Sequence, residues 1–148
     1  MTELEVTLED RTSLEALCER YAAAFESQKA SSISESWDMP AQITVHDRNI
    51  VFSTREKFDA NTDMLLAFYV RQGVKKVSRR LENVLKLAQD AAAITVLDKV
   101  FGGDGSLICA WRAAYLVRRN AQGAWQNVSG VADGEVEAWR AIGVELGK

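Results

Sequence analysis

The side chains best suited to acid–base chemistry lie in two short stretches of the chain. His46 is the only histidine, so any histidine chemistry depends on it, and Asp98 interrupts an apolar run. A carboxylate buried among apolar side chains has a raised pKa and can accept a proton near neutral pH. Asp98 is therefore a candidate base if the fold turns it inward, whereas Asp47, beside His46, stands where aspartate is also favoured as a turn former.

The alternation of side chains along the predicted strands leaves two of these placements open. If Ile94 and Val96 face inward, Asp98 does too, but a bulge that shifts the alternation would place it at the surface. His46 falls on the face opposite Ile43 and Val45. It is either a surface residue of a hairpin or a group at the mouth of a pocket.

Composition and motifs exclude several function classes. The net charge is −3 and the pI about 5.3, so no basic face for nucleic acid is expected. One histidine and two distant cysteines, Cys18 and Cys109, cannot form a recognisable metal-ligand cluster, and we expect both thiols to be free and buried. No phosphate-binding glycine loop or nucleophile elbow is present. Without a membrane-spanning run or a secretion signal, the chain is expected to be cytoplasmic and not membrane-bound.

Three capping boxes predict the starts of three helices in the first half of the chain. In each, a hydroxyl side chain stands three residues before a glutamate: Thr12-Ser13-Leu14-Glu15, Ser32-Ile33-Ser34-Glu35 and Ser53-Thr54-Arg55-Glu56. Residues 1–11 are expected to be a loose arm. The second helix is predicted to be short, carrying Trp37 and stopping at Pro40, and the third to end at Gly73.

The second half of the chain has the period-two pattern of strands. Four runs separated by short turns predict an antiparallel meander, and a small hairpin is expected earlier, at 43–46 and 50–52. The four runs are 74–88, 91–101, 107–119 and 124–132. Strands of this length must twist and bend, and the adjacent Val84 and Leu85 suggest a bulge. One α+β domain over residues 1–148 is predicted, with N-terminal helices packed on a strongly curved antiparallel sheet around an internal pocket, and a possible helix within 134–148.

The same alternation predicts which side chains line that pocket. Trp111 and Tyr115 share the uncharged face of the third long strand, and the first long strand turns Asn83 inward with Arg79 at the rim. Trp37 could form a pocket wall, as could Trp111, although core packing would explain both equally well. The predicted ligand-binding residues are Trp37, Tyr69, Asn83 and Trp111.

The order of these elements resembles the nuclear transport factor 2-like superfamily, whose members form α+β cones, and its ketosteroid isomerase and polyketide cyclase branch in particular. The stretches Glu19–Phe25 and Thr44–Asp47 resemble parts of the ketosteroid isomerases. The resemblance implies that Tyr21 donates a hydrogen bond to a substrate carbonyl and that Asp47 is the general base. Tyr115 falls near the family's second donor, which is an aspartate there. Dehydratase and cyclase members pair imidazole with carboxylate, which would make His46 and Asp47 such a unit.

Two functions remain open at this point. One is an enzyme that isomerises, dehydrates or cyclises an apolar carbonyl compound without a cofactor, with Asp47 or Asp98 as base. The other is a non-catalytic dimeric module that binds a ligand or a protein. A homodimer through the outer face of the sheet is implied by the resemblance. A deep pocket with a carboxylate held against tyrosine hydroxyls would favour the enzyme.

Overall fold

The computed structural model describes residues 4–147 as four helices and six strands. In chain order the elements are α1 (Leu8–Glu26), α2 (Ala30–Ser34), β1 (Trp37–Val45), β2 (Arg48–Phe52), α3 (Arg55–Arg71), β3 (Lys76–Ala88), β4 (Ala91–Phe101), β5 (Leu107–Arg119), β6 (Trp125–Val131) and α4 (Asp133–Ala141). No helix in this part of the chain is both long and apolar enough to cross a membrane.

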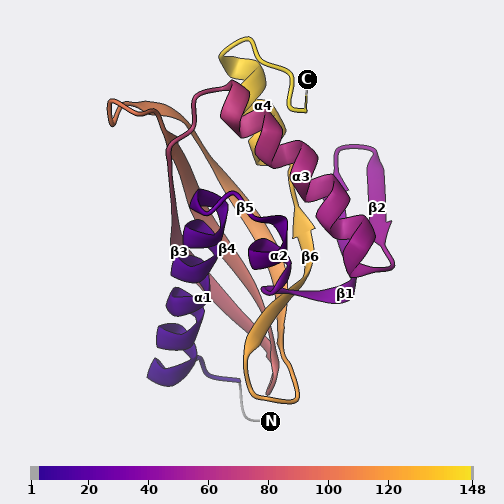
Figure 1. Cartoon of the computed structure of the whole chain (residues 1–148). Helices are drawn as coiled ribbons and strands as arrows, with labels where there is room; N and C mark the ends of the chain where they lie inside the picture. The colour runs from indigo at the N-terminus through magenta and orange to yellow at the C-terminus, as the bar shows by residue number, and fades with distance from the viewer. Residues whose placement is uncertain (1–3, 148) are drawn as a thin grey trace.

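All six strands form one sheet in the order β2-β1-β6-β5-β4-β3. The predicted meander is confirmed, because β3, β4, β5 and β6 pair antiparallel in sequence and each lies within two residues of its predicted bounds. The sheet is mixed, however, since β1 pairs parallel with β6, and it is not strongly curled. The prediction of a wholly antiparallel, strongly curved sheet is therefore not confirmed. Figure 1 shows α1, α2 and α3 on one side of this sheet.

The first helix begins earlier than predicted. Thr7 caps it through a capping box with Asp10, so the expected loose arm over residues 1–11 is wrong for residues 8–11. Residues 1–3 of that arm lie outside the described residues. Asp10 favours this start because its buried carboxylate also pairs with Lys86 of β3 and Arg119 of β5. Ser13, from the predicted box, instead accepts a hydrogen bond from Trp125.

The second helix ends at Ser34 and does not carry Trp37, which begins β1. Pairing with β6 and burial of the indole, which is 1% exposed, outweigh the local helix signal. The third helix begins and ends close to its predicted bounds. Thr54 caps α3 by accepting a hydrogen bond from the backbone of Lys57, and Gly73 follows the helix with a φ of +75°, a conformation that favours glycine.

The last helix closes the core over the end of the sheet. Trp139 of α4 is fully buried and packs edge-on against Phe68 of α3 at a centroid distance of 5.1 Å. Gly134 permits this docking, because a Cβ built there would lie 2.2 Å from the carbonyl oxygen of Arg112 in β5. The first turn of α4 thus rests directly on the backbone of the sheet.

We predict that Gly134→Ala lowers the free energy of unfolding by about 1–3 kcal/mol, because the clashing atom belongs to the backbone and cannot rotate away. Gly103→Ala is the matched control, since a Cβ there meets only the Lys75 side chain at an ordinary 3.5 Å. Denaturant unfolding of both variants tests this. Equal midpoints would show that α4 can shift without cost.

Candidate functional site

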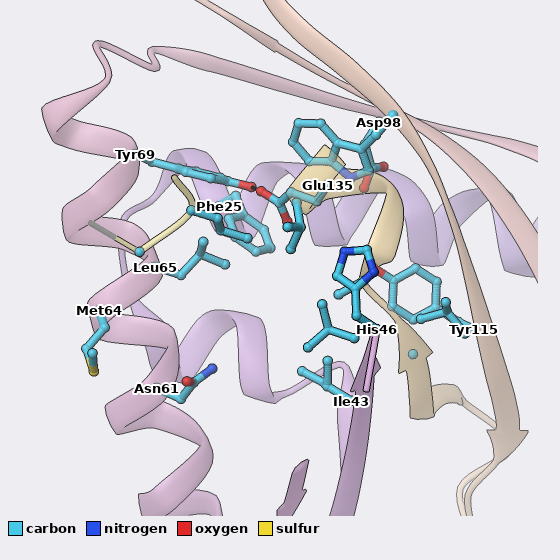
Figure 2. A pocket seen from close by; sticks show the side chains of 18 of the residues that line it. Phe25, Ile43, His46, Asn61, Met64, Leu65, Tyr69, Asp98, Tyr115 and Glu135 are labelled. Atoms are coloured by element: carbon cyan, nitrogen blue, oxygen red, sulfur yellow. Dashed lines mark hydrogen bonds between the residues drawn. The ribbon is translucent and has the colours of Figure 1, made fainter. Parts of the chain in front are cut away.

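A cavity of about 770 Å³ lies between the helices and the inner face of the sheet. Residues from α1, α3, α4 and all six strands line it. Figure 2 shows Phe25, Ile43 and Leu65 on its apolar walls, with Tyr69 directed toward Glu135. Since most of its wall is apolar, the few polar groups identify the chemistry that the cavity can support.

A buried ion pair forms the polar end of this cavity. Arg79 of β3 donates from Nε and Nη2 to the two carboxylate oxygens of Asp98 in β4, both at 2.7 Å. Each side chain is only 6% exposed. The register opposes these residues directly, so neighbouring strands present the two charges side by side. Asp98 is buried, which is one of the two predicted alternatives. Both of its carboxylate oxygens accept hydrogen bonds from Arg79, so Asp98 holds Arg79 in place and is poorly available as a base.

Two tyrosines complete the cluster around the guanidinium. Arg79 Nη2 also donates to the hydroxyl of Tyr115 at 2.8 Å, and the guanidinium lies 4.1 Å from the ring centre of Tyr21. The Tyr21 hydroxyl accepts a hydrogen bond from Nε1 of Trp37 at 3.1 Å. Because each hydroxyl accepts from a nitrogen, its own proton is left for another acceptor. Burial raises the pKa of Tyr21 and of Tyr115, so both hydroxyls keep that proton.

A second carboxylate reaches the cavity from α4. Oε2 of Glu135 accepts hydrogen bonds from the Tyr69 hydroxyl and from Nε1 of Trp139. The other oxygen, Oε1, has no hydrogen-bond partner among the described residues, and it is not fully buried. Burial raises the pKa of Glu135 to about 7, with Asp98 adding to the rise, while the hydrogen bonds and Arg79 oppose it. This carboxyl can therefore take or give a proton at neutral pH.

His46 and Asp47 lie at the open end of the cavity. Both line it, and both are exposed at the turn between β1 and β2. His46 does not form the unit with Asp47 that the resemblance implies as one of two possibilities, because its Nδ1 lies 3.5 Å from Oδ2 of Asp133. The catalytic roles predicted for His46 and Asp47 stay predictions.

The structure brings most of the predicted site residues together. Eight of them line the same cavity: Tyr21, Trp37, His46, Asp47, Tyr69, Asp98, Trp111 and Tyr115. Trp37 and Trp111 serve both as walls and as core, since they are 1% and 7% exposed. Asn83 is the exception. The register of β3 shifts between Leu81 and Asn83, so the bulge precedes the one predicted at Val84 and Leu85. The Asn83 side chain is therefore exposed, and it donates a hydrogen bond to Thr95.

Two side chains of the cavity differ from the sequence prediction. Arg79 is predicted at the rim, but it lies inside because its charge is matched by Asp98 on the next strand. Glu135 is predicted only as part of a terminal helix. Its spacing from Trp139, four residues further on, places both on one helix face and could have indicated that it points inward. No cluster of three or more His, Cys, Asp or Glu side chains suited to a metal occurs within residues 4–147.

Comparison with known proteins gives a family and a fold. The family described as NTF2-like protein (DUF6841) matches residues 9–135. No functionally curated protein matches the sequence.

Many solved structures share the fold at low sequence identity. An NTF2-like protein with a cystatin-like fold from Novosphingobium aromaticivorans is 23% identical, with a TM-score of 0.60 over 93% of this chain and 90% of that one. A ketosteroid isomerase-like protein from Erwinia carotovora atroseptica is 16% identical, with a TM-score of 0.60 over 84% and 95%. A domain of unknown function with a cystatin-like fold from Nostoc punctiforme is 15% identical, with a TM-score of 0.67 over 84% and 76%. At these identities the likeness shows the fold alone.

We predict that Arg79→Met destabilises the protein by about 3–5 kcal/mol, because it leaves the Asp98 carboxylate buried without its partner. Replacing both, as Arg79→Met with Asp98→Leu, should restore much of that loss. Arg112→Met is the matched control, since Arg112 is 71% exposed in its pair with Glu82, and the substitution should leave the denaturation midpoint nearly unchanged. An equal effect of Arg79→Met and Arg112→Met would contradict the importance of the buried pair.

Proposed function

The chain belongs to the NTF2-like protein family (DUF6841), and we propose that it is a small-molecule enzyme of the isomerase or lyase type. Its substrate is an apolar carbonyl compound that enters the cavity, and the reaction begins with removal of a proton from the carbon next to the carbonyl. The residues of this chain supply the acid–base groups without a cofactor.

The single observation that supports this proposal most strongly is the setting of Glu135. One oxygen is held by Tyr69 and Trp139, and the other is free at the cavity wall. A general base must be fixed in place yet able to reach the substrate proton, and its pKa should lie near the working pH. Glu135 meets these conditions better than Asp98, whose two oxygens both bind Arg79.

The cluster of Tyr21, Tyr115 and Arg79 supports the other half of the reaction. Removing a proton beside a carbonyl places negative charge on the carbonyl oxygen, which pre-positioned donors stabilise in a water-poor site. The Tyr21 and Tyr115 hydroxyls each have a free proton, and their rings lie 6.5 Å apart. Arg79 is neutralised by Asp98, so the cluster suits a neutral carbonyl that gains charge only during the reaction.

The non-catalytic module is the competing function, and it would use the same cavity to hold a ligand unchanged. The homodimer through the outer sheet face and the cytoplasmic location remain predictions.

We predict that the protein catalyses exchange of the protons next to the carbonyl of α-tetralone with deuterated water, and that Glu135→Gln slows this exchange at least about a hundredfold. Glutamine can keep the contacts to Tyr69 and Trp139, so the fold should persist. Exchange followed by NMR measures the effect. Asp47→Asn is the control: a hundredfold loss there, with Glu135→Gln unaffected, would return the base role to Asp47. Binding without any exchange would favour the module.

The exchange rate should rise with pH and level off above about 7, the pKa of Glu135. Only the ionised carboxylate can accept a proton, so below that value the rate should fall roughly tenfold per pH unit. The titratable or charged groups near Glu135 are Asp98, Arg79, Tyr69, Tyr21 and Cys109. Arg79, Tyr69 and Tyr21 keep their protons in this range, and burial raises the pKa of Cys109 to about 11, so it does too. A rate that is flat between pH 5 and pH 9, about two units on either side of that pKa, would contradict the assignment.

A further inference from the structure

His46 is held in an uncommon backbone conformation at the edge of the cavity. Its φ is +50°, a region that residues other than glycine seldom adopt and that is often found at functional sites. One carboxylate contacts it twice. The backbone N–H of His46 donates to Oδ1 of Asp133 at 3.1 Å, and the imidazole Nδ1 lies 3.5 Å from Oδ2.

The first turn of α4, which carries Asp133, also carries the proposed base Glu135. Asp133 and Glu135 flank Gly134, whose contact with the Arg112 carbonyl fixes the start of α4 on the sheet. Asp133 thus reaches the β1–β2 turn while Glu135 reaches the cavity. In Figure 2 the His46 imidazole is directed into the space below Glu135, among the lining side chains.

We propose that His46, positioned by Asp133, is a second ligand-contacting group at the open end of the cavity, and that the natural ligand carries a second oxygen substituent there. This inference rests on the proposed function, since it names the substrate class of the same site. The ligand would have a carbonyl at the Tyr21–Tyr115 end, an apolar middle and a hydroxyl or second carbonyl near the mouth.

The two nitrogens of the imidazole support this division of roles. Nδ1 faces Asp133, so a proton on Nδ1 is stabilised by the carboxylate and leaves Nε2 to the cavity. Nε2 can then accept from a ligand hydroxyl, or donate to a ligand oxygen when the ring is protonated. Asp133 touches no ligand in this scheme and acts only through His46, as a positioning residue.

The first test needs no ligand, because the chain's lone histidine gives a single set of imidazole nitrogen signals. In the wild type these signals should show the proton on Nδ1, and Asp133→Ala should shift them toward the form with the proton on Nε2. Asp47→Ala, which removes the carboxylate next to His46 in sequence, is the matched control and should leave them unchanged. Identical signals in the wild type and Asp133→Ala would overturn the positioning role. If Asp133→Ala does not fold, Asp133→Asn replaces it, and a smaller shift in the same direction is expected, because the neutral amide oxygen is a weaker acceptor than a carboxylate.

The second test compares binding of α-tetralone with that of its hydroxylated form, in which the hydroxyl lies on the ring carbon opposite the carbonyl. The wild type should prefer the hydroxylated form by roughly fivefold, the value of one hydrogen bond. That preference should disappear in His46→Leu and Asp133→Ala and persist in Asp47→Ala. If the preference survives in His46→Leu, the inference is wrong while the proposed function stands. If neither ketone binds, the proposed function fails and this inference fails with it.

Discussion

The buried pair of Arg79 and Asp98 is the constraint on which the arrangement of the site depends. A guanidinium removed from water must find acceptors for its protons, and here the two carboxylate oxygens and a tyrosine hydroxyl provide them. These contacts require β3 and β4 to turn opposed residues to the same side of the sheet. They also fix the hydroxyl of Tyr115, and the guanidinium lies against the ring of Tyr21. One ion pair therefore orients groups from three strands and a helix.

Aromatic packing joins this cluster to the rest of the core. The Trp37 ring lies edge-on to Tyr115 at 5.9 Å and donates its N–H to Tyr21. The hydrophobic cluster that contains Trp37, Phe52 and Phe58 is thereby joined to the polar groups around Arg79. Phe25 packs between Tyr21 and Tyr69 with its ring tilted to both, at centroid distances of 5.1 and 5.7 Å. The cavity is thus bounded by rings whose positions are set by packing, which is how a small domain can keep an open space without collapsing.

The first turn of α4 adds the groups that the sheet itself cannot supply. Gly134 lets this turn approach the backbone of β5, and the residues on either side then point to different places. Glu135 is held beside Tyr69 and Trp139 in surroundings that disfavour its charge, whereas Asp133 holds the turn that carries His46. Burying an ionisable carboxyl such as Glu135 among apolar side chains lowers the stability of the folded state. Burial of Trp139 on the same helix offsets this loss by holding α4 against the core.

Local patterns in the sequence determined the four long strands, the third helix and the inward face of β5, whereas they left the inward face of β4 open. Alternation along a strand is a property of neighbouring residues, so Trp111 and Tyr115 could be placed correctly from sequence. The tertiary structure decided what depends on partners far along the chain. Asp10 pairs with Lys86 and Arg119 and so moves the start of α1, and the bulge at Glu82 turns Asn83 outward. The spacing of Glu135 from Trp139 could indicate only that its side chain points inward. Its hydrogen bond to Tyr69, a residue 66 positions earlier, depends on how α4 docks and cannot be predicted from local spacing.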